Sequence, residues 1–159
     1  MKITLLSVGK LKEKYLKDGI AEYAKRLSRF CDFEMLEVPD EQAPENLSRA
    51  QELQVMAKEA DRLLEKVKPG AIKILLDVSG EKPDSEGLSK KMDDFMQRGS
   101  SHLVFIIGGS LGVDQRLRES ADYRLSLSAM TLPHQLVRLV LVEQIYRGFK
   151  IMRGEVYHK

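Results

Sequence analysis

The chain of 159 residues contains few thiol or imidazole side chains: a single cysteine, Cys31, and three histidines. One cysteine excludes an internal disulfide, and three scattered histidines leave no cluster with the spacing of metal ligands. We therefore expect no metal site. No apolar run approaches the roughly 20 residues of a membrane-spanning helix. The first nine residues lead into a strand pattern instead of a signal peptide, which favours the cytoplasm and no membrane partner.

The composition is that of one globular domain, which we expect to span residues 1–159. Hydrophobic residues make up 43% of the chain and charged residues 31%. That balance is enough for a substantial core. Internal repeats and low-complexity tails are also absent.

The net charge of +2 conceals an uneven distribution. Residues 1–30 have eight Lys/Arg against three Asp/Glu, 31–70 have five against ten, and 134–159 have five against two. If the fold brings the two basic ends together, they form a patch suited to a phosphate backbone. The alternative is that the lysines at 10, 12, 14 and 17 are only a solvated helix face.

Strand and helix patterns alternate along the whole chain. The expected strands are residues 2–8, 33–38, 71–78, 102–107 and 123–127, and the expected helices are about 13–30, 45–67, 85 or 88 to 97, 114–120, and a terminal helix opened by Pro133. This order predicts the α/β class, as a single-domain α/β sandwich with a mostly parallel sheet of about five strands.

The terminal helix carries apolar side chains around most of its circumference. They are Leu136, Val137, Leu139, Val140, Leu141, Val142, Ile145, Tyr146 and Phe149. One sheet face cannot absorb them all, so we expect a second copy of the same surface to cover the other side, in a two-fold homodimer.

Three expected strand ends carry unusual residues. Leu76 and Asp77 with Gly80 follow the third strand, glycines 108 to 112 follow the fourth, and 127–132 follows the fifth. Ligands of parallel sheets bind at the carboxyl ends of the strands, so we expect the site where these loops converge.

The run FIIGGSLG admits a second interpretation. It lacks the spacing of the dinucleotide fingerprint and the lysine of the phosphate loop. It does match Gly-x-Ser-x-Gly, the nucleophile elbow of serine hydrolases, with Ser110 central. Asp114 or Asp122, followed by His134 or His158, would complete the triad. The chain is short for that fold, and no glycine-rich oxyanion loop precedes the elbow.

Two groups at the chain's end have both structural and functional interpretations. His134 and Arg138 are four residues apart, as in a capping or surface pair. Arg147, Lys150 and Arg153 form one basic helix edge, which is usually solvated. This edge, however, leads into an apolar and aromatic tail, which we expect to dock beside the pocket.

The terminal run PHQLVRLVLVEQIYRGFKIMRGEVYHK, together with FIIGGSLG and LLDVSG, resembles the ribosomal large-subunit methyltransferase H family. That family belongs to the SPOUT class of S-adenosylmethionine-dependent RNA methyltransferases and modifies N3 of a pseudouridine in 23S rRNA. The resemblance covers essentially the whole chain. It implies a trefoil knot in the C-terminal half, whose loops bind the methyl donor S-adenosyl-L-methionine. By position, the donor contacts are Leu76, Gly108, Leu127, Ser128, Ala129, Met130, Thr131 and Leu132.

The resemblance also implies roles for the tail. His158 is the candidate base for the imide proton, Arg147 or Arg153 the candidate group that stabilises the developing anion, and Tyr157 the residue that positions the nucleoside. In the family dimer one subunit's tail lies near the other's donor pocket. The small chain lacks an added RNA-binding domain, so we expect the substrate to be 23S rRNA within the assembled 70S ribosome. The alternative is a ribosome-associated RNA-binding protein that has lost the chemistry.

Overall fold

The computed structural model describes all residues from Met1 to Lys159 and contains one sheet of five strands in the order β2-β1-β4-β3-β5. Its strands are β1 (Lys2–Val8), β2 (Asp32–Val38), β3 (Ile72–Glu81), β4 (His102–Ile107) and β5 (Tyr123–Leu125), and its helices are α1 (Lys14–Leu27), α2 (Arg49–Lys66), α3 (Ser85–Gln97), α4 (Gln115–Ser120) and α5 (Leu136–Met152). Every strand pairing is parallel. The predicted α/β class and five strands are confirmed, with a sheet that is entirely parallel.

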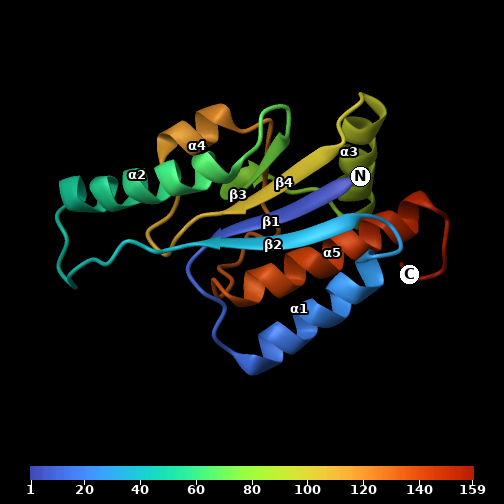
Figure 1. Cartoon of the computed structure of the whole chain (residues 1–159), viewed down its shortest axis with the longest axis horizontal. Helices are drawn as coiled ribbons and strands as arrows, with labels where there is room; N and C mark the ends of the chain where they lie inside the picture. Colours follow the sequence, from blue (N-terminus) through green and yellow to red (C-terminus); the bar gives the residue numbers. More distant parts are fainter.

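Helices cover both faces of the sheet (Figure 1). Alternate residues of the central strand β1 point to opposite faces, as the pleat requires. Ile3 and Leu5 join a core of 17 buried residues with α1, α3 and α5, whereas Leu6 and Val8 join a core of 11 with α2 and α4. Because all strands run in one direction, the loops that follow them gather at one edge of the sheet, at the left of Figure 1.

Three of the element ends that differ from the prediction belong to α2, α5 and β3, and local hydrogen bonds explain the first two. α2 begins at Arg49 instead of near residue 45, because Ser48 and Gln51 form a reciprocal capping box. Pro133 does not open α5 directly: its carbonyl accepts from Val137 N at 3.0 Å in a turn, and the helix begins at Leu136.

The third difference is the longer β3, which ends at Glu81 instead of residue 78. Leu76 and Glu81 both pair with Leu125, so the residues between them bulge away from β5. Ser126 N then donates to Glu81 O at 2.8 Å, and β5 ends at Leu125. A Cβ on Gly80 would lie 2.6 Å from the carbonyl carbon and oxygen of Arg124, so this crossing requires a glycine.

α5 lies between α1 and α3 on the sheet, and both helices contact it. Leu139 packs against α1 at Gly19, where an added Cβ would lie 3.1 Å from the leucine methyl groups. The apolar circumference of α5 therefore does not by itself require a second copy, because its own neighbours cover much of the second side. The homodimer itself stays a prediction.

Candidate functional site

A small pocket opens where β3 and β5 end, and we call it the β3–β5 pocket. Its volume is about 70 Å³, and it is lined by Leu76, Asp77, Val78, Leu125, Ser126, Leu127, Ser128, Met130, Leu132 and Val137. Leucine side chains form an apolar slot, and the loop after β5 brings backbone groups to its edge. That loop is held in shape because Ser126 Oγ donates to Ser128 O at 3.0 Å and Met130 N donates to Ser128 Oγ at 2.9 Å.

The structure brings two of the three expected strand ends into this pocket. Among the predicted donor contacts, Leu76, Leu127, Ser128, Met130 and Leu132 line it. Ala129 and Thr131 belong to the same loop and are exposed. Gly108 is buried at the end of β4 and does not line the pocket. The glycine loop that follows it faces a different cavity, so the predicted convergence of all three loops is incomplete.

Asp77 fixes the floor of the β3–β5 pocket. Its carboxylate is almost fully buried and accepts from Ser79 N at 3.0 Å, Ser79 Oγ at 2.9 Å and Arg118 Nε at 2.9 Å. Burial alone would raise the pKa of Asp77, but these hydrogen bonds and the Arg118 charge outweigh it and hold the pKa below its ordinary value. The strand end is therefore held by an ionised carboxylate, a role that the sequence pattern did not reveal.

The tail residues form a second cluster around Glu143 of α5. Arg147 Nε and Tyr157 Oη both donate to Glu143 Oε1, each at 3.0 Å, and Arg147 Nη1 lies 3.2 Å from His158 Nδ1. The Arg147 guanidinium also covers the Tyr157 ring, 4.7 Å from its centroid. Burial raises the pKa of Tyr157, and its hydrogen bond to Glu143 acts in the same direction, so this hydroxyl remains a donor. We call these four residues the tail cluster.

Within one chain the tail cluster lies far from the β3–β5 pocket. Val137 lines the pocket, and Arg147 follows ten positions later on the same helix, about 15 Å along its axis. Figure 1 shows α5 starting at the edge where the strands end and the chain terminus at the opposite end of the sheet. The tail docks on the body of the chain, as predicted, but not beside the pocket. It packs on α5, where the ring centroids of Tyr157 and Tyr146 lie 5.0 Å apart.

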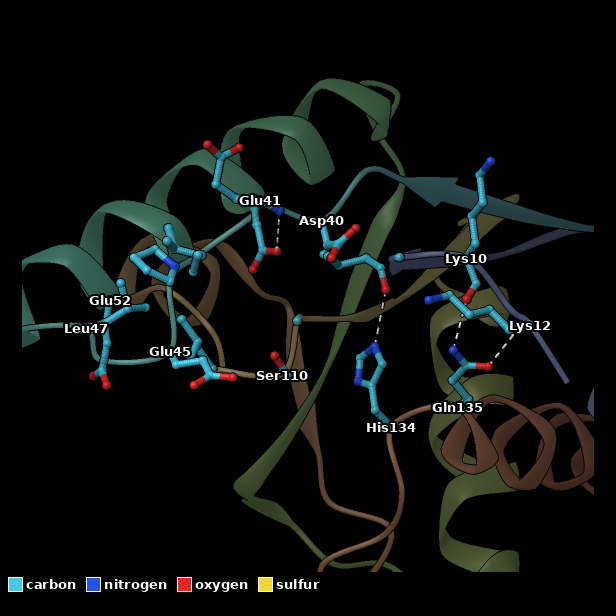
Figure 2. A pocket seen from close by; sticks show the side chains of 18 of the residues that line it. Lys10, Lys12, Asp40, Glu41, Glu45, Leu47, Glu52, Ser110, His134 and Gln135 are labelled. Atoms are coloured by element: carbon cyan, nitrogen blue, oxygen red, sulfur yellow. Dashed lines mark hydrogen bonds between the residues drawn. The ribbon is translucent and has the colours of Figure 1, made fainter.

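The largest cavity of the molecule lies beyond β1 and β4, and we call it the large cavity (Figure 2). Its volume is about 630 Å³. In Figure 2, Lys10 and Lys12 lie on one side, Glu45, Leu47 and Glu52 on the other, and Ser110 and His134 between them. Glu59 of α2 and Arg138 of α5 also line the cavity.

The large cavity contains both Ser110 and His134, yet it holds no hydrolase triad. His134 Nε2 lies 3.2 Å from the carbonyl oxygen of Val8, which can only accept, so this nitrogen carries the proton. Asp114 caps α4 and Asp122 accepts from the backbone of β3. No hydrogen bond joins Ser110 to a histidine, and none joins His134 to a carboxylate. The nucleophile-elbow interpretation of Ser110 therefore lacks the histidine and the carboxylate that would activate the serine.

The predicted pair of His134 and Arg138 is neither a cap nor a surface pair. Arg138 is fully buried; it donates to Glu37 Oε2 and Val8 O, each at 2.8 Å, and to Gly9 O at 3.1 Å. Burial lowers the pKa of His134, which favours the neutral imidazole. Both side chains therefore fasten the start of α5 to the loop after β1.

The two basic ends of the chain do meet, since α1 and α5 are in contact. Arginines that follow the two helices share one aromatic ring: the guanidinium carbons of Arg29 and Arg153 lie 4.9 and 4.8 Å from the centroid of the Phe30 ring. Arg26 lies over Tyr23 at 5.1 Å. Exposed arginines supported by aromatic rings form a surface suited to a phosphate backbone.

Two classes of site have no candidate in the structure. No group of three or more His, Cys, Asp or Glu side chains is placed to hold a metal ion. No helix combines the length and apolarity needed to cross a membrane.

Comparison with known proteins gives matches over essentially the whole chain. A family model described as predicted SPOUT methyltransferase matches residues 1–158. Three similar curated proteins are each named ribosomal RNA large subunit methyltransferase H: those of Ruminiclostridium cellulolyticum (60% identical), Acetivibrio thermocellus (55%) and Leuconostoc citreum (54%), each over 159 residues and 100% of both chains.

Proposed function

The chain belongs to the SPOUT methyltransferase family, and from this premise we propose that it methylates N3 of a pseudouridine in 23S rRNA, with S-adenosylmethionine as donor. The proposal is carried by the sequence identity of 54% to 60%, over the full length, to three relatives named as large-subunit rRNA methyltransferases. The basic surface shared by α1 and α5 supports an RNA substrate. The trefoil knot that the resemblance implies stays a prediction.

The β3–β5 pocket suits the donor chemically. Leu76, Leu127 and Leu132 offer an apolar slot for an adenine ring, and the loop after β5 offers backbone groups for its nitrogens. Pockets for ligands of this kind are typically about 300–1,000 Å³, whereas this one is about 70 Å³. We therefore expect the loop to open on binding. Two wall residues, Val78 and Met130, are 75% and 77% exposed, so their side chains are not held by core packing.

When bound, the donor supplies an electrophilic methyl group, and the protein's task is to remove the imide proton of the base. We assign that task to His158. Arg147 donates to His158 Nδ1, which leaves the proton of a neutral imidazole on Nε2. The substrate N3–H would take the place of Arg147 at Nδ1, and the displaced guanidinium would stabilise the anion as it forms. Tyr157, fixed by Glu143, would position the nucleoside.

Since the tail cluster and the β3–β5 pocket are far apart in one chain, we propose that the active unit is a homodimer with sites shared between protomers. Mixed dimers test this. A His158→Ala protein and a Leu127→Arg protein should each be inactive, because one lacks the base and the other the donor. After subunit exchange, about a quarter of wild-type activity should return, since about half the dimers are mixed and each has one intact site. No recovery after verified exchange would show that each site lies within one chain.

The reaction itself is tested with ribosomes from cells that lack this protein. Purified protein and labelled donor should produce N3-methylpseudouridine in the 23S rRNA of 70S particles, identified by mass spectrometry of nucleosides, and far less in free 23S rRNA. Methylation at another atom, or equal rates on both substrates, would contradict the proposal. If donor fails to bind in calorimetry, the non-catalytic RNA-binding alternative replaces it.

A further inference from the structure

The large cavity has a position and size that a ligand site requires, and the proposed reaction does not use it. It opens at the carboxyl ends of the neighbouring strands β1 and β4, whose following helices α1 and α4 cover opposite faces of the sheet. In parallel sheets such a divergence opens a crevice in which ligands bind. Its volume of about 630 Å³ lies within the usual range for small-molecule sites.

Glu59 is the unusual residue of this cavity. Its side chain extends from α2 and is 5% exposed, and no lysine, arginine or histidine forms an ion pair with it. Oε2 accepts from Glu41 N at 3.1 Å. Oε1 accepts no hydrogen bond and lies against Gly109, where an added Cβ would overlap it. On a side chain that is 5% exposed, this oxygen has little access to water and no donor within the chain, so a ligand N–H is a suitable partner.

The state of the carboxyl group agrees with this geometry. Burial raises the pKa of Glu59, and the nearby carboxylate of Asp40 acts in the same direction, while the backbone N–H of Glu41 opposes both. An N–H donor from a ligand would offset the cost of burying the Glu59 carboxylate. The hydrogen bond that it forms would be strong, since hydrogen bonds to a charged acceptor are the stronger class.

The opposite wall of the cavity is cationic. Lys10 and Lys12 are exposed and form no ion pair with a carboxylate of the chain. Gln135 fixes the backbone that carries them: its Nε2 donates to Lys10 O and its Oε1 accepts from Lys12 N, each at 3.0 Å (Figure 2). The backbone that carries the two lysines is thus fixed at the rim of the cavity.

The large cavity and the β3–β5 pocket lie close together at the start of α5. Gln135 and Arg138 line the first and Val137 lines the second, and no residue lines both. A substrate that reaches the methyl donor therefore passes near the large cavity.

From this arrangement we infer that the large cavity binds one unpaired nucleobase of the substrate RNA, with Glu59 accepting a ring N–H and Lys10 and Lys12 contacting the adjoining phosphates. The inference rests on the proposed function. The buried carboxylate disfavours a phosphate inside the cavity, which therefore belongs at the lysine rim. A ring N–H at neutral pH is present in guanine, uracil and pseudouridine and absent from adenine and cytosine, and single-stranded RNA is read through such edges.

The experiment measures binding of pentaribonucleotides by fluorescence anisotropy at one low salt concentration. The probes are AAGAA and AAUAA, with AAAAA and AACAA lacking a ring N–H at the central base. Wild-type protein should bind the first two about tenfold more tightly or better, as a charge-assisted hydrogen bond implies. This preference should disappear in Glu59→Gln, which removes the charge, and in Gly109→Ala, whose methyl group would displace the carboxylate.

Glu65→Gln is the matched control, because Glu65 is exposed on the same helix and does not line the cavity. It should keep the wild-type preference. Retained donor binding and unfolding midpoints in all three variants exclude misfolding. If Glu59→Gln and Gly109→Ala keep the preference, or the wild type has none, the inference is wrong. If the wild type shows the preference and the two variants lose it, but the wild type transfers no methyl group, only the proposed reaction is overturned.

Discussion

Replacing Glu37 with methionine should destabilise the protein more than replacing Arg138 with methionine, although Arg138 is the more deeply buried partner. The Arg138 side chain is 0% exposed and the Glu37 side chain 29%. Glu37→Met leaves a guanidinium with no carboxylate in a site closed to water, and it also removes the acceptor of Leu11 N. Breaking a buried ion pair from one side costs about 3–5 kcal/mol.

Arg138→Met leaves the opposite charge in a milder environment. Glu37 still reaches water and keeps its 2.6 Å hydrogen bond from Leu11 N. Val8 O loses the Arg138 donor but keeps its hydrogen bond with His134. Gly9 O is therefore the only acceptor of Arg138 that is left without a donor. We expect a cost of about 1–3 kcal/mol, the penalty of an unsatisfied buried acceptor. The double variant leaves neither charge and should cost less than the sum, with a coupling of about 1–3 kcal/mol.

Urea unfolding followed by far-UV circular dichroism measures all four proteins of this cycle. Protomer concentration is held constant, because the unfolding of an oligomer depends on it. The expected result is that Glu37→Met lowers the free energy of unfolding more than Arg138→Met does. The double variant should lower it by less than the sum of the two single variants. Equal costs, the reverse order or simple additivity would refute the reasoning that water access to the remaining charge decides the cost.

Three other properties can be predicted. Gly80→Ala should lower the free energy of unfolding by about 1–3 kcal/mol, because its Cβ would meet the backbone of Arg124; an unchanged urea midpoint would contradict this. Burial raises the pKa of Cys31 to about 11, so a disulfide reagent near pH 8 should label this thiol slowly until urea is added, and immediate labelling would refute it. Burial also lowers the pKa of His102 and His134, so the unfolded chain binds more protons and the melting temperature should fall from about pH 7.5 to about 5.5. A His102→Gln, His134→Asn protein should have a flatter profile, and a slope as steep as that of the wild type would exclude these histidines as the cause.

The features that could be predicted from the sequence depend on residues close together in the chain. The alternation of short apolar runs with amphipathic stretches predicted each strand and helix. The meeting of two expected strand ends in the β3–β5 pocket could be predicted because ligands of parallel sheets bind at the carboxyl ends of the strands.

The features that could not be predicted join distant segments. Arg138 and Glu37 are 101 positions apart, and nothing in the local pattern of either pairs them. Glu59 falls within an ordinary amphipathic helix, and its burial depends on where Gly109 passes. The ends of β3 and β5 were misjudged for the same reason, since the bulge opposite Leu125 is set by pairing between two segments.

The position of α5 after all five strands affects how the protein is made. Leu141, Val142, Ile145, Tyr146 and Phe149 complete the core of 17 buried residues, to which α1 and α3 also contribute. During synthesis, part of that face of the sheet stays uncovered until α5 emerges, because domains fold as units. A chain that stopped before α5 would expose this apolar surface, so we expect it to aggregate or be degraded and to show no activity.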